Sequence, residues 1–204
     1  MTGKIKLNAA SGGGSVSFQA PSSTGDDRVI TLPTTADGTV LTTTNPKAGN
    51  ILQVVQASKK GPTSSTSGSF TAITGLSASI TPSSASNKIL VRVCLGTVAT
   101  TGNQYAHFIR LYKAGSHLTD ASAPTAGSRV SCFMGGRTTN VNHSQGYSGE
   151  YLDTAGGTSS ITYAVYWTGE GGFGTIYLNC EQNNPDGGAY LHNISTITLM
   201  EVAG

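Results

Sequence analysis

Short apolar runs that alternate with polar residues recur along the whole chain, and turn-forming residues separate them. Such period-2 alternation, bounded by Gly, Pro or Asn, is typical of β-strands, and no window shows the spacing of a surface helix. Alternating β and α units are absent too, so a parallel nucleotide-binding fold is not expected. The strands expected beyond residue 47 are 51–56, 70–73, 76–80, 88–95, 106–112, 130–134, 161–167, 175–180 and 194–202.

The first 47 residues differ from the rest of the chain because their strands are shorter and carry few large apolar side chains. The strands expected here are 5–7, 16–20, 29–32 and 40–41. A segment of this kind cannot close a core of its own. We expect residues 1–47 to intertwine with copies of the same segment and to dock on a larger structure; a flexible linker is the alternative, which the alternation disfavours. Residues 48–204 are expected to form an antiparallel β-sandwich or jelly-roll-like domain.

Few of the 204 residues are charged, and this limits the kinds of partner that the chain is expected to bind. Only 11% of the residues are charged and the net charge is +2, against roughly 25% charged residues in typical soluble domains. The basic residues are scattered, which disfavours binding to nucleic acid or to a membrane surface. No apolar run approaches the roughly 18 residues of a membrane-spanning helix, and the start lacks the apolar core of a signal peptide. We therefore expect synthesis and retention in a cytoplasm.

Metal and thiol chemistry find little support in the sequence. An odd cysteine count without a secretory signal predicts reduced thiols in structural roles. The histidine separations fit no metal motif, so neither a metal nor a cofactor is expected; a ring of histidines on a trimer axis is the alternative. The cysteines are Cys94, Cys132 and Cys180, and the histidines are His107, His117, His143 and His192.

Enzymatic motifs are weak as well, and we expect no enzymatic activity. The glycine-rich run 169–174 lies between strands, whereas a phosphate loop needs a helix after it. The nucleophile motif Gly-x-Ser-x-Gly is absent. Glycoside cleavage needs two carboxylates around a sugar, and acids such as Glu150 and Glu170 lie in or beside expected loops. A polysaccharide-degrading enzyme is therefore kept as an alternative.

The loops 135–150, 168–174 and 181–192 are long, and recognition usually lies in such loops on a rigid scaffold. Aromatic faces pack on the C–H faces of sugars, and we expect the loop aromatics to be exposed for such contacts. Trp167, by contrast, is expected in the core or at a subunit interface. The expected receptor-binding residues are Arg137, His143, Tyr147, Phe173 and Tyr190.

Several segments resemble fibre proteins of tailed bacteriophages. The first part carries "SGGGSVSFQAP", "RVITLP" and "GTVLTT", which are similar to the strand-and-glycine segments of such fibres. The second part resembles a C-terminal fibre domain through "SITPSSASNKILVRV", "SGEYLD", "SSITYAVYW" and "STITLMEVA". The order and spacing of these motifs carry the resemblance, which covers most of the chain.

The resemblance implies a homotrimeric, β-rich appendage of the virion, assembled in the bacterial cytoplasm. Residues 1–47 would attach it to other phage structural proteins, and the loops of residues 48–204 would bind a host-surface glycan. The chain is shorter than most host-binding fibres. A decoration or cement protein of the phage head is therefore the second reading.

Overall fold

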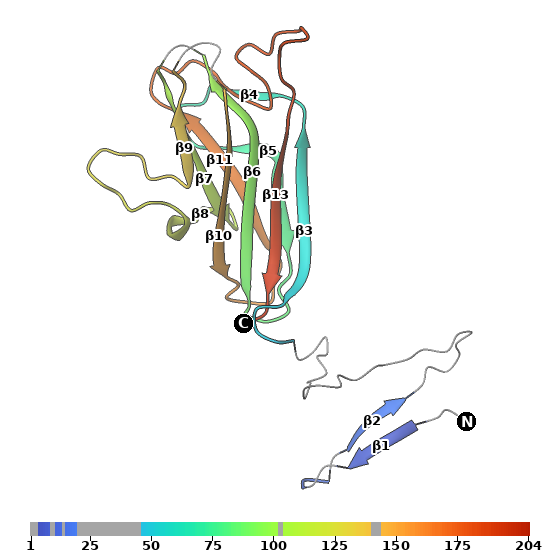
Figure 1. Cartoon of the computed structure of the whole chain (residues 1–204). Coiled ribbons are helices and arrows are strands. Elements are labelled where there is room, and N and C mark those ends of the chain that lie inside the picture. The colour runs from blue at the N-terminus through green and yellow to red at the C-terminus, as the bar shows by residue number, and fades with distance from the viewer. Residues whose placement is uncertain (1–3, 9–10, 14, 20–45, 102–103, 140–143) are drawn as a thin grey trace, which may run out of the picture. The chain divides into compact units, whose positions relative to one another are not determined.

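The computed structural model divides the chain into two compact units, Met1–Val40 and Leu41–Gly204 (Figure 1). The predicted division at residues 47 and 48 stays a prediction, because residues 20–45 lie outside the described part. The structure describes residues 4–8, 11–13, 15–19, 46–101, 104–139 and 144–204.

The described part of the first unit is a β-hairpin. Strand β1 (Lys4–Asn8) pairs antiparallel with β2 (Ser15–Gln19), which confirms two of the expected strands. The side chains of Ile5 and Leu7 are exposed, and a lone two-stranded hairpin is marginally stable in water. The strands expected at residues 29–32 and 40–41 fall outside the described residues.

The second unit is all-β, as the alternation predicts, and every strand pairing described in it is antiparallel. Its one helical turn is the short 3-10 helix η1 (Thr119–Ala121) among the described residues. The strands are β3 (Ile51–Lys60), β4 (Thr63–Ser65), β5 (Thr71–Ile80), β6 (Lys88–Thr100), β7 (Ala106–Lys113), β8 (Ser116–His117), β9 (Met134–Arg137), β10 (Gln145–Thr154), β11 (Ile161–Gly169), β12 (Ile176–Leu178) and β13 (Ile194–Val202).

These strands form two sheets that lie one behind the other in Figure 1. The six-stranded sheet runs β3-β13-β6-β12-β4, with β10 on the other side of β6. The five-stranded sheet runs β5-β11-β7-β8, with β9 also paired to β7. The arrangement is consistent with a β-sandwich.

The core lies between the two sheets because alternate residues of each strand point inward. From the six-stranded sheet, Ile89, Val91 and Val93 of β6 are buried, and from the five-stranded sheet, Tyr163 and Val165 of β11 join the same cluster. Trp167 also lies in this core, which is one of the two positions expected for it.

Three expectations about strands and loops are wrong. Residues 145–150, expected in a loop, belong to β10, which pairs with β6. The apolar–polar alternation of β10 is interrupted in the sequence by Gly149, which carries no side chain. Gly149 lies so close to Met134 and Phe133 that a Cβ atom there would be 3.0 Å from each of them. Residues 63–65, expected in a loop, form β4 because β12 offers them a pairing edge. The strand expected at 130–134 begins only at Met134.

A buried carboxylate holds the end of the second unit where β3 begins and β13 ends. Glu201 accepts hydrogen bonds from Gln53 Nε2 (2.6 Å), the Ser83 amide (2.6 Å) and hydroxyl (2.8 Å), and Asn87 Nδ2 (2.6 Å). Burial by itself raises the pKa of Glu201, but these hydrogen bonds outweigh it and hold the pKa below its ordinary value.

A second polar cluster ties the two sheets together. Asp153 on β10 accepts a hydrogen bond from the Tyr163 hydroxyl of β11 at 2.6 Å and pairs with Lys113 Nζ of β7 at 2.7 Å. Burial and this bond to the carboxylate raise the pKa of Tyr163. Asp153 therefore lies in a strand and in the interior.

No helix in the described ranges is long and apolar enough to cross a membrane.

Replacing Glu201→Gln should lower the free energy of unfolding by ~1–3 kcal/mol at pH 7. The reason is that the single oxygen of a side-chain amide cannot accept all four hydrogen bonds that the two carboxylate oxygens accept. The native pKa is depressed, so the carboxylate stabilises the fold above its unfolded pKa of about 4.3. The difference between wild type and variant should therefore shrink as the pH falls below about 4.3. Urea unfolding at fixed protein concentration measures it, with the exposed loop acid in Asp186→Asn as control; equal stability of E201Q and wild type at pH 7 would contradict the analysis.

Candidate ligand-binding site

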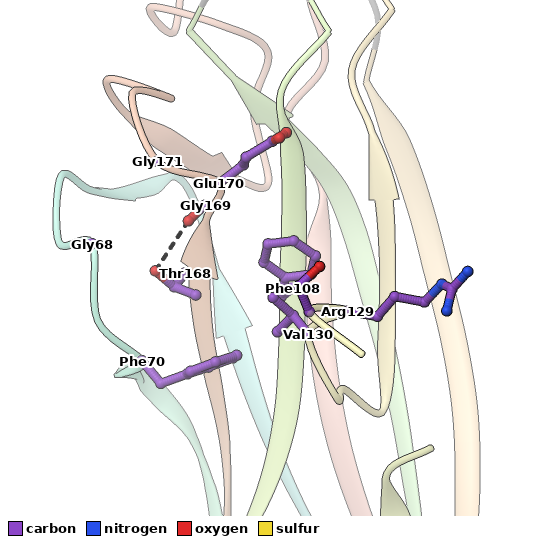
Figure 2. Close-up of a pocket in the computed structure, with 10 residues that line it drawn as sticks. Gly68, Phe70, Phe108, Arg129, Val130, Thr168, Gly169, Glu170 and Gly171 are labelled. Atoms are coloured by element: carbon purple, nitrogen blue, oxygen red, sulfur yellow. Dashed lines mark hydrogen bonds between the residues drawn. The ribbon is translucent and has the colours of Figure 1, made fainter. Parts of the chain in front are cut away.

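A hollow of about 520 Å³ opens on the outer face of the five-stranded sheet. Phe70 lies on one side of it and Phe108 and Val130 on the other, while Thr168 and Glu170 bound it at the end of β11 (Figure 2). This volume falls within the range of about 300–1,000 Å³ that is usual for small-molecule sites.

The pleat of β7 and β11 explains why these side chains face outward. Thr168 pairs with Phe108 across the two strands, so both lie on the same face of the sheet. Their neighbours His107 and Trp167 point to the opposite face and are buried. The outward face of β7 thus carries an aromatic ring at the point where β11 ends.

Arg110 connects the two walls of the hollow. Its guanidinium lies over the Phe70 ring, 3.9 Å from the ring centre, a cation–π arrangement. Its Nε also donates a hydrogen bond to the Ser131 carbonyl at 2.8 Å. One side chain therefore holds both the phenyl ring before β5 and the loop that carries Val130.

The acidic edge of the hollow is held by charge and by the backbone. Glu170 Oε2 accepts a hydrogen bond from the Ala106 amide at 3.0 Å and lies 3.1 Å from Arg137 Nη2. The bond from Ala106 and the positive charge of Arg137 lower the pKa of Glu170, so the carboxylate is ionised at neutral pH.

The lining of the hollow combines aromatic rings with a single carboxylate. Glu170 is the one acid among the described residues that line it, whereas glycoside cleavage needs two. Glu150 lies on β10 in the other sheet. Figure 2 shows the Arg129 side chain pointing away from the two phenyl rings. The walls therefore offer aromatic faces, and the rim offers a carboxylate and backbone groups of Gly169 and Gly171.

A second, smaller hollow of about 360 Å³ lies on the same face of the same sheet. Tyr112 and Tyr166 stack beside it with ring centres 3.6 Å apart and planes 13° apart. Small residues form the rest of its surface, among them Ala72, Ser77 and Ala164. Since Tyr166 pairs with Arg110 and Arg110 contacts Phe70, the aromatic residues continue from the first hollow to the second.

Two of the predicted receptor-binding residues lie near the start of β7. Arg137, on β9, is exposed and bonded to Glu170 and to the Gln104 carbonyl. Tyr147, on β10, is half-buried; its hydroxyl is 2.7 Å from His107 Nε2, and burial raises its pKa to about 12. The expectation that Tyr147 is an exposed loop residue is therefore wrong.

The other three predicted residues have different environments. Phe173 is only 4% exposed, so its expected exposure is wrong: the ring packs on Gly169 inside the core. Tyr190 is 47% exposed, as expected, in the loop before β13. His143 lies outside the described residues.

The sequence analysis missed Phe70, Phe108 and Arg110 as site residues. The signal was present in β7, where aromatic and basic residues alternate with apolar ones, so that a strand with a buried face carries a second, ring-rich face. Phe70 carries no such signal, because its position depends on how the chain enters β5 from β4.

The described residues contain no group of three or more His, Cys, Asp or Glu side chains placed to hold a metal ion. The three cysteines are free thiols.

Adding a methyl group at Gly169 should disturb the packing behind the rim. A Cβ atom there would lie 2.2 Å from the nearest atom of the buried Phe173 ring. Gly169→Ala should lower the free energy of unfolding by ~1–3 kcal/mol. Gly171→Ala is the matched control, since no atom lies within 4 Å of a Cβ added there. Urea unfolding followed by Trp167 fluorescence measures both; equal stability of the two variants would refute this packing.

Comparison with known proteins places the chain in no family. No family model matches it, and no curated protein matches it. One solved structure, titled "Structure of infectious bursal disease virus Gt strain", is similar at a TM-score of 0.39 and 13% sequence identity. The similarity covers 93% of this chain, which spans about half, 48%, of that viral chain.

Proposed function

We propose that this chain is a structural protein of a tailed-bacteriophage virion, a homotrimeric fibre that binds a host-surface glycan. The N-terminal segment, residues 1–47, attaches the fibre to other phage structural proteins, and the C-terminal β domain carries the binding surface. Function then depends on contact without bond cleavage.

The observation that carries the binding role is the hollow between Phe70 and Phe108. Aromatic faces with a rim of fixed polar groups are the combination that a sugar needs, because its C–H faces are apolar and its hydroxyls need partners. Glu170 can accept hydrogen bonds from hydroxyls, since its low pKa keeps it ionised. The stacked Tyr112 and Tyr166 would extend the contact to further sugar units of the same glycan.

One feature favours association of several chains. The hairpin of β1 and β2 leaves Ile5 and Leu7 exposed, and contact with other chains would bury them. A trimer would also carry three hollows, which would raise the overall affinity for a glycan through effective concentration without any new contact.

The decoration or cement protein of the phage head remains the second candidate, because the same domain could be carried by either part of the particle. Electron microscopy of intact particles labelled on this chain separates the two. The polysaccharide-degrading enzyme is the third candidate and is tested by release of reducing ends from host polysaccharide.

Binding of the full chain to an array of purified bacterial surface polysaccharides tests the proposal. We expect Phe108→Ser and Phe70→Ser to weaken binding of the recognised polysaccharide at least tenfold. Tyr190→Ala, which removes an exposed aromatic of a different loop, should leave binding unchanged.

Failure of wild type to bind any polysaccharide would reject the glycan proposal. Loss of binding in Y190A alone would instead move the receptor site to the loop before β13. Trp167 fluorescence of each variant confirms that the core is intact.

A further inference from the structure

The outer face of the six-stranded sheet carries a line of apolar side chains across four strands. Leu152 of β10 pairs with Leu90 of β6, Leu90 pairs with Met200 of β13, and Met200 pairs with Val54 of β3. Directly paired residues share one face of a sheet, so these four side chains form one row perpendicular to the strands. We call Val54, Leu90, Leu152 and Met200 the apolar row.

The apolar row lies on the surface and not in the core. Leu152 is 51% exposed and Val54 is 57% exposed, while Leu90 and Met200 are half-buried. The neighbouring residues on these strands point inward to the core instead, as Ile89 and Leu199 do.

Further apolar residues lie beside the row, toward the start of β3. Val202 pairs with Ile51, which is 58% exposed. With strands spaced about 4.8 Å apart, the row alone extends for about 14 Å. A contiguous apolar patch of this kind on a soluble protein marks an interaction surface.

The charges next to the apolar row indicate what covers it. In the adjoining row Glu150 pairs with Arg92 across β10 and β6. Both side chains are exposed, and neither makes an ion pair with another residue of the described part. A surface with both signs side by side is complementary to a copy of itself, whereas a partner of one sign would oppose one of the two charges.

We infer that the apolar row is the surface through which copies of this chain pack against one another, with Arg92 of one copy reaching Glu150 of the next. The inference rests on the proposed trimer and names the contact that holds its β domains together. Burial of the row removes apolar surface from water, and closed symmetry repeats the same contact at each interface.

Sedimentation velocity of the full chain over a dilution series tests this contact. Val54→Glu should raise the concentration at which the assembly is half dissociated at least tenfold, because it buries a charge in an apolar interface. Ser58→Glu is the matched control: it adds the same charge to an exposed position on the same face of β3, four residues away, and should leave the dissociation concentration unchanged. Leu152→Glu should repeat the effect of V54E from a different strand.

Charge reversal gives an independent test. Arg92→Glu and Glu150→Arg should each weaken association, and the double variant should restore it toward wild type.

The outcomes separate this inference from the proposed function. An oligomeric wild type whose dissociation is unchanged in V54E, L152E and the charge reversals would overturn the apolar row as the contact and leave the trimer standing. A monomeric wild type would overturn both.

Discussion

Burial of alternate side chains between two sheets is the constraint on which the second unit depends. Strand β6 is central to it, because Ile89, Val91 and Val93 face the core while the residues between them face outward. Each strand therefore presents one face to the interior and leaves the other for contacts outside. Because hydrophobic burial fixes the register, it also determines which side chains meet on the two outer faces.

The two outer faces carry different chemistry. The five-stranded sheet presents aromatic rings, small residues and a fixed carboxylate around two hollows. The six-stranded sheet presents an apolar row and a neighbouring pair of opposite charges. In our account the first face binds glycan and the second forms the contacts between copies. The glycan-binding faces of the assembly would therefore point away from the contacts between its subunits.

Much of the fold could be predicted from alternation, and the failures have physical reasons. Strand β13 has the predicted bounds, because β-branched and other apolar residues that favour strands fill most of its length. Strand β10 was missed because Gly149 fills a tight position without an apolar side chain. Phe173 was assigned to the surface because a glycine-rich loop suggests exposure, yet Gly169 makes room for its ring. The hollow could not be predicted, since Phe70 and Phe108 come to lie on its two sides only because β11 pairs with both β5 and β7 and Arg110 reaches the Phe70 ring.

An experimental structure of the purified full chain, determined with the recognised polysaccharide bound, tests the central claim most directly. The account predicts a threefold assembly in which the apolar row of each copy faces a neighbouring copy, and sugar density lies between Phe70 and Phe108. A single chain in solution, or an assembly with these rows facing solvent and the phenyl rings covered by protein, would contradict it.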